Sequence, residues 1–346
     1  MQGKRLLVVA LLVTGLPLAL WWLTPGNTDE AIWQDYLERL ARLTRQDVPD
    51  RAPLPIKPYP GTRELREALP EHRVDLLDYL ELRHCDLMEL ISQRNSALGK
   101  LQADSLRLNH ELAFIRRARS CLEAQTLEDP VLSATLATVV TEKSAALPAL
   151  YWNVLVASEE TRHFFSQSPS QQGGDISAGL GSLQRLAHTL SRHREHHVLA
   201  PLDLEPLLET LIHNPGGGKV LRRMALALRE LERGNQLLAG IDPQRLCPKD
   251  RASTRARRLR NVLDNVWGPR VQATLTDNRR RYRQLMETLR LMNGMQVSDQ
   301  AVFRDWRRHY FGPAGVEKQL EQALARHVRL WQSRLRPCGL MPDGHP

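Results

Sequence analysis

The chain has 346 residues, of which 42% are hydrophobic and 25% charged, and its formal net charge is +9. This length is sufficient for one large or two ordinary domains, and the composition excludes a wholly disordered chain. Arginines carry most of the positive charge and sit beside acidic residues on predicted helix faces, as in residues 229–233. This pattern indicates a solvated helix surface, so we expect no nucleic-acid partner.

The amino-terminal segment predicts export. Two basic residues precede an uncharged apolar run over residues 6–23, and two acidic residues follow it. The run is long enough for a short membrane span, and the charge asymmetry places the body outside. We therefore predict a signal anchor over 1–26 in the bacterial inner membrane, single-pass, with a periplasmic body. The alternative is a signal peptide cleaved before Asn27, which would leave a soluble periplasmic protein.

The next region, 27–61, combines a helix with a proline-rich linker. Residues 29–45 repeat apolar side chains at helical spacing, which predicts an amphipathic helix. Residues 48–61 contain five prolines and cannot form a helix, so we expect an extended segment that lies on the domain. The remainder, 62–346, is expected to be one helical periplasmic domain, or two lobes over 62–165 and 183–346.

Four cysteines predict two disulfides, since an even number in an exported chain favours pairing and none forms a C-x-x-C motif. Residues 74–121 are expected to form a helical hairpin, with one long helix up to Gly99 and a second from Asp104. In that arrangement Cys85 and Cys121 face each other. The local choice is therefore Cys85–Cys121, which leaves Cys247–Cys338.

The rest of the chain is also predicted to be helical, because no segment alternates with a period of two for long enough to form a strand. Residues 128–165 predict two helices broken near Pro148, and Pro269 is expected to break or kink a long helix. Further helices are predicted over 183–198, 202–212, 220–238, 251–295, 299–310 and 316–335. The predicted fold is all-α, a multi-helix bundle built from long antiparallel helical hairpins, with an N-terminal membrane anchor or signal segment.

Several of these segments together resemble a known family. The resemblance lies in Cys85, residues 94–100, Cys121, residues 151–153 and residues 158–160, and it extends over most of the chain after Asp29. The chain resembles the bacterial domain-of-unknown-function family 3080 (DUF3080), whose members are often labelled lipoproteins. The resemblance implies an envelope protein without an assigned activity. No cysteine precedes Cys85, so a peptide anchor replaces the lipid anchor here.

The first candidate site is the polar cluster Arg94, Asn95, Ser96 and Lys100. Ser96 and Lys100 are one helical turn apart, as a serine–lysine nucleophilic pair would require. The G-x-S-x-G and S-x-x-K motifs are missing, so we favour hydrogen bonds that satisfy the helix end. The alternative function from this cluster is an envelope hydrolase with a site near residues 94–100 and Glu159.

The second candidate cluster is Trp152, Asn153, Glu159 and Glu160. Adjacent helical residues point about 100° apart, so the two glutamates do not form an acid–base pair by themselves. We expect Trp152 to lie in the core and a glutamate to pair with an arginine such as Arg94 or Arg162.

A histidine run and a glycine run complete the candidates. The histidines are His188, His193, His196 and His197. His193 and His197 have the i, i+4 spacing of metal ligands but lack the H-E-x-x-H order, so metal binding is a second alternative function. Residues 214–219 (NPGGGK) lack the first glycine and the Ser or Thr of a P-loop, which indicates a helix break.

The leading hypothesis is an exported helical envelope protein that acts by binding or scaffolding. We assign no catalytic residue, no metal ligand and no small-molecule cofactor, and we expect a membrane contact and an envelope protein partner.

Overall fold

The computed structural model describes residues 28–70, 82–167 and 174–341. Every regular element within these ranges is helical, which confirms the predicted all-α class. The predicted anchor over 6–23 lies outside the described residues. Within the described ranges, no helix is long and apolar enough to cross a membrane.

The chain divides into two compact units, each assembled from separate stretches of sequence. Of the described residues, unit 1 contains those up to Pro55, Arg223–Asn278 and those from Val316 onward. Unit 2 contains Ile56–Arg222 and Arg279–Gly315. The units are therefore discontinuous in sequence, unlike the contiguous lobes 62–165 and 183–346 that the sequence suggested.

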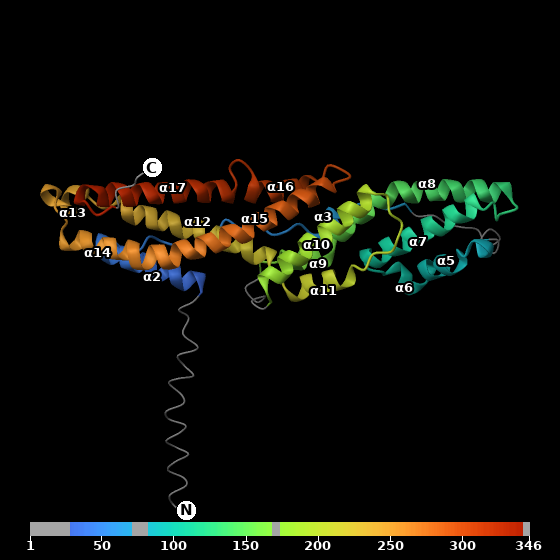
Figure 1. Ribbon diagram of the computed structural model, residues 1–346, viewed down its shortest axis with the longest axis horizontal. Coiled ribbons are helices and arrows are strands. Elements are labelled where there is room, and N and C mark those ends of the chain that lie inside the picture. Colours follow the sequence, from blue (N-terminus) through green and yellow to red (C-terminus); the bar gives the residue numbers. More distant parts are fainter. Residues whose placement is uncertain (1–27, 71–81, 168–173, 342–346) are drawn as a thin grey trace, which may run out of the picture. The chain divides into compact units, whose positions relative to one another are not determined.

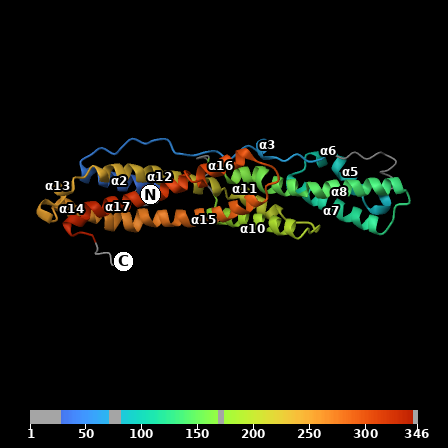
Figure 2. The same cartoon turned by 90° about the horizontal axis from the view of Figure 1, so that it is seen from above.

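In unit 1, four helices lie side by side, as both views show (Figure 1 and Figure 2). They are α2 (Asp29–Thr44), most of α12 (Gly217–Ala239), α14 (Thr254–Val262) and α17 (Val316–Leu335). The short helix α13 (Pro243–Leu246) packs against α17. The second predicted disulfide, Cys247–Cys338, closes this unit with a Cα–Cα distance of 5.1 Å.

The core of unit 1 contains a polar network around His327, whose side chain is fully buried. Asn235 donates from Nδ2 to the carbonyl of Ala323 at 3.1 Å, so its Oδ1 accepts from His327 Nδ1 at 2.8 Å. His327 Nε2 therefore accepts from the Tyr36 hydroxyl at 2.6 Å and from Trp331 Nε1 at 3.1 Å. The imidazole is held neutral, and burial lowers the pKa of His327 to about 3.

Unit 2 contains the remaining helices. They are α3 (Thr62–Leu65), α5 (Met88–Asn95), α6 (Ala97–Lys100), α7 (Asp104–Glu123), α8 (Pro130–Trp152), α9 (Glu159–Phe164), α10 (Ile176–Glu195), α11 (Glu205–His213), α16 (Ala301–Phe311) and the larger part of α15 (Ala273–Gly294). Helices α7 and α8 pack along each other, with α5 and α6 at their side (Figure 1 and Figure 2). Most of the predicted helices are present within a few residues of the expected ends.

The first predicted disulfide lies inside the apolar core of unit 2. Cys85 and Cys121 are joined with a Cα–Cα distance of 5.2 Å, and both are buried. The apolar residues around them come from α5, α7 and α8, with Leu82 and Leu87 on either side of Cys85. The disulfide therefore fixes the segment before α5 onto α7, as the spacing of the cysteines predicted.

The prediction of one long helix up to Gly99 is wrong for its described part. A 3₁₀ turn over Leu82–Cys85 is followed by Asp86, whose φ of 55° ends regular helical geometry. The chain breaks again at Ser96, which adopts extended geometry and caps α6. Gly99 lies inside α6 instead of ending a helix.

The predicted break at Pro148 is also absent. Helix α8 continues through Pro148 to Trp152 and passes into a π-helical segment over Asn153–Ala157. The chain leaves helical geometry only at Ser158, whose side chain accepts a hydrogen bond from the backbone N–H of Thr161 at 3.3 Å. In unit 1, Pro269 lies within another π-helical segment, Leu263–Gln272, which joins α14 to α15.

The helix break predicted over residues 214–219 is confined to 214–216, because α12 begins at Gly217, and the glycine run also permits close packing. A Cβ on Gly217 would lie 2.4 Å from the ring of Phe164, and one on Gly218 would lie 1.9 Å from the carbonyl oxygen of Ser166. Both contacts are shorter than a side chain tolerates, so the start of α12 approaches the end of α9 only because these residues lack side chains.

Candidate functional site

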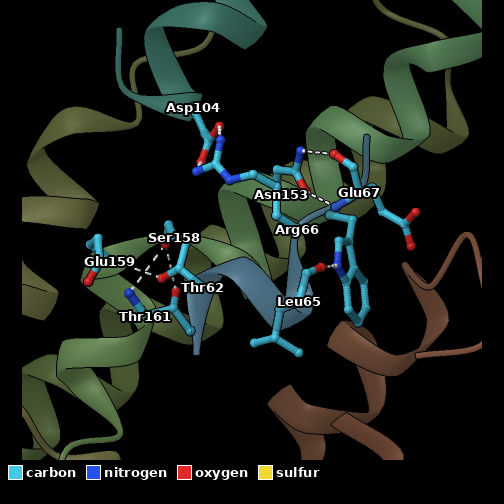
Figure 3. A network of polar contacts seen from close by, with 10 residues as sticks. Thr62, Leu65, Arg66, Glu67, Asp104, Asn153, Ser158, Glu159 and Thr161 are labelled. Carbon is cyan, nitrogen blue, oxygen red and sulfur yellow. Dashed lines mark hydrogen bonds and ion pairs between the residues drawn. The ribbon is translucent and has the colours of Figure 1, made fainter. Parts of the chain in front are cut away.

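A network of polar contacts holds α3 and the residues after it onto the end of α8 (Figure 3). Trp152 Nε1 donates to the carbonyl of Leu65 at 2.6 Å. The amide of Asn153 accepts from the backbone N–H of Glu67 at 2.8 Å and donates to the Glu67 carbonyl at 3.0 Å. Because both side chains are fully buried, they satisfy backbone groups that would otherwise be buried without partners. Trp152 and Asn153 thus position α3.

Glu159 lies at the other end of the same network, exposed to solvent (Figure 3). Its carboxylate accepts from Arg162 Nε at 2.6 Å and from the Thr62 hydroxyl at 2.9 Å. The hydrogen bond from Arg162 is the main cause that lowers the pKa of Glu159. The expected glutamate–arginine pair is therefore present, with Arg162 as the partner. Glu160 follows it on α9 and is partly exposed.

The contacts described for the cluster on α5 and α6 are local. Arg94 Nη1 donates to the carbonyl of Gly99. The Ser96 hydroxyl donates to the Gln93 carbonyl at 2.8 Å and accepts from the Gly99 N–H at 2.9 Å. Asn95 is exposed, and the structure does not describe the side chain of Lys100. These contacts satisfy the junction between the two helices, as the sequence predicted.

In the histidine run, His193 is buried and the other three histidines are exposed. His193 Nε2 lies 3.0 Å from the carbonyl oxygen of Ala200, so this nitrogen carries the proton. His193 Nδ1 then accepts from the Tyr151 hydroxyl at 2.7 Å. Desolvation lowers the pKa of His193 and raises the pKa of Tyr151 to about 12. Both ring nitrogens of His193 are thus engaged within the protein. Among the residues that the structure describes, no three potential ligands come together around a metal position.

A cavity of about 520 Å³ in unit 2, here called the Tyr151 cavity, borders this histidine–tyrosine pair. Its wall combines apolar side chains with two arginines, Arg119 and Arg194. Arg119 donates to the Ser144 hydroxyl at 3.0 Å, and Arg194 makes a long contact of 3.4 Å with the carbonyl of Gly294. The apolar part of the wall comes from Leu147, Pro148, Val198, Leu199 and Met295.

The comparisons with known proteins assign a family and no activity. The model of the family described as "Protein of unknown function (DUF3080)" matches residues 33–342, which is nearly the whole chain. The chain belongs to the DUF3080 family. No curated protein and no solved structure matches it.

Sequence reasoning did not predict the Tyr151 cavity of this DUF3080 member. Arg119 is on α7, Tyr151 on α8 and Arg194 on α10, and each is unremarkable within its own helix. His197 of the histidine run lines the cavity, but the sequence suggested metal binding for this run.

Proposed function

We propose that this DUF3080 protein is an exported cell-envelope protein that acts by binding, and that it holds a small amphiphilic anion in the Tyr151 cavity. The supporting observation is a ligand-sized cavity of about 520 Å³ that has apolar walls and two arginines. Cavities of roughly 300–1,000 Å³ with apolar walls and few polar groups are typical of small-molecule sites.

The arginines argue for a negatively charged group on the ligand. Neither Arg119 nor Arg194 has a carboxylate partner in the part of the chain that the structure describes. Glu195 also lines the cavity, and its carboxylate accepts from the Ser191 hydroxyl at 2.9 Å. An anionic head beside the arginines would complete charge-assisted hydrogen bonds, while an apolar body would cover Val198 and Leu199.

The envelope location rests on the apolar run and on the cysteines. The run over 6–23, with basic residues before it and acidic residues after it, supports an inner-membrane anchor with a periplasmic body. Two cysteine pairs at disulfide distance are consistent with an oxidising compartment. Within the same proposal, the helices form a bundle of long antiparallel hairpins, of which α7 and α8 would be one. Mass spectrometry of the mature protein tests the anchor, and an amino terminus at Asn27 would exclude it.

Calorimetric titration of the full chain in nanodiscs tests the ligand, with decanoate as the probe and empty nanodiscs subtracted. We expect saturable binding that Arg194→Gln and Val198→Asp each weaken at least tenfold, because the first removes a cation and the second places an anion in the cavity. The matched control is Val131→Asp, since Val131 is 71% exposed on α8 and does not line the cavity. Absence of saturable binding, or equal losses from the two valine variants, would contradict the proposal.

A further inference from the structure

A second pocket in unit 2, of about 380 Å³, is lined by three arginines. Arg63 comes from α3, Arg66 follows that helix directly, and Arg107 comes from the first turns of α7. Asn153 forms part of the wall between them. We call this the arginine pocket. None of its lining residues belongs to the Tyr151 cavity, so it is an independent site.

The charges in the arginine pocket are only partly compensated. Asp104 neutralises Arg66 through two hydrogen bonds of 2.9 and 2.7 Å, as Figure 3 shows. Neither Arg63 nor Arg107 has an ion-pair partner among the described residues. Within the described part of the chain, the pocket therefore presents two guanidinium groups whose positive charges are not paired.

Glu67 also lines the pocket, and the hydrogen bonds of its carboxylate go to residues outside it. Its Oε1 accepts from the Ser298 hydroxyl at 2.5 Å and from Gln300 Nε2 at 2.7 Å. Figure 3 shows this carboxylate directed away from the Arg66 guanidinium. Glu67 therefore does not compensate the guanidinium groups directly.

Arg107 is the residue that points most clearly to a ligand. Its Nε is buried and has no hydrogen-bond partner in the described structure. Desolvation is the main cause that lowers the pKa of Arg107, and repulsion from Arg94 and Arg66 adds to it, while attraction from Glu111 and Asp104 partly opposes the shift. Leaving a buried donor without an acceptor is unfavourable, and more so when the group is charged. An oxyanion in the pocket would supply the acceptor and relieve the repulsion.

The pocket wall also contains the side chain of Asn153. The amide nitrogen of Asn153 uses one N–H for the Glu67 carbonyl, and an amide nitrogen has two. Asn153 is fixed by its two hydrogen bonds to the backbone of Glu67, so this part of the pocket wall is held in place before a ligand arrives.

We propose that the arginine pocket binds a phosphate monoester dianion, with Arg63, Arg66 and Arg107 as its ligand-binding residues. A phosphate monoester carries about −1.5 to −2 charges at neutral pH, which matches two unpaired guanidinium groups better than a carboxylate does. Its three free oxygens can accept from several arginines at once, and guanidinium groups form paired bonds with such oxygens. This site goes beyond the amphiphile bound in the Tyr151 cavity and does not depend on it.

Calorimetry on the full chain in nanodiscs of zwitterionic lipid tests this site, with inorganic phosphate as the probe at constant ionic strength. We expect Arg107→Gln and Arg63→Gln each to weaken phosphate binding by at least about tenfold, because each removes a charge-assisted donor. Arg63 is exposed, so its substitution leaves the core intact. The matched control is Arg116→Gln, at an exposed arginine on the same helix as Arg107, which should change affinity less than twofold.

The source of the phosphate is distinguished by two further probes, glycerol 3-phosphate and dihexanoyl phosphatidic acid. Equal affinities for all three probes support a free phosphate monoester as the ligand. An affinity at least tenfold higher for phosphatidic acid, which Arg107→Gln lowers and Arg194→Gln leaves unchanged, supports a lipid headgroup bound by the same pocket. The proposal is overturned if acetate binds as tightly as phosphate, if Arg107→Gln and Arg63→Gln leave the affinity within twofold, or if Arg116→Gln weakens binding equally.

Discussion

The buried imidazole of His327 predicts a loss of stability in mild acid. The group has a pKa of about 3 in the folded protein and 6.5 when unperturbed, so only the unfolded chain binds a proton between these values. Stability is therefore fully present above pH 6.5 and falls as the pH drops toward 3. At pH 5, about 1.5 pH units below the unperturbed value, the loss from His327 alone is about 2 kcal/mol.

The test compares the wild type with His327→Gln, which cannot titrate. Urea unfolding at pH values from 7.5 to 5 gives the free energy of unfolding of each protein. Below pH 6 the wild type should lose about 1.4 kcal/mol more per pH unit than the variant, whatever stability the variant loses at neutral pH. Burial also lowers the pKa values of His110 and His193. Both residues are present in both proteins, so their contributions to the pH dependence of the free energy of unfolding cancel in the comparison. His188→Gln, at an exposed histidine, is the control. Equal slopes for the wild type and His327→Gln would refute the reasoning.

Two further predictions concern packing and cross-linking. Gly218→Ala should destabilise the protein by about 1–3 kcal/mol in urea unfolding, because its Cβ would overlap the Ser166 carbonyl. Gly181→Ala on α10 meets only a side-chain atom of Arg185 at 3.4 Å and should be neutral or stabilising, so similar losses for both variants would contradict the packing argument. Replacing both Cys85 and Cys121 with alanine should lower the free energy of unfolding by about 4 kcal/mol, from a sequence separation of 36 residues. An unfolding midpoint equal to that of the wild type would show that this disulfide adds no constraint.

Sequence periodicity predicted the helices whose buried faces are regular. The range 316–335 agrees with α17 at both ends, and the cysteine spacing predicted both pairs. Such features are encoded locally, through the repeat of apolar residues and the geometry of a short connection. The hydrogen bonds of Ser96 were predictable for the same reason, because its hydroxyl contacts backbone groups only a few residues away.

Features that depend on distant partners were not predictable in this way. Proline at position 148 lies within α8, and the chain instead breaks at Ser158, where a capping side chain is available. The left-handed geometry of Asp86 has no clear local signal. The pockets were missed for the same reason: Arg63 and Arg107 belong to different helices, and only the fold brings them to one wall. The buried Tyr36–His327 bond joins residues that are 291 positions apart.

That last separation has a consequence for synthesis. Helix α2 is made early, yet Tyr36 bonds to His327 on α17, which is made near the end. The stretch Ile56–Arg222 of unit 2 is contiguous and is complete long before unit 1 can close. The aromatic face of α2 must therefore stay uncovered while most of the chain is made. A premature stop before α17 would leave the buried Tyr36 hydroxyl without its partner His327, so a defect at the carboxyl terminus would be felt in the first helix of the body.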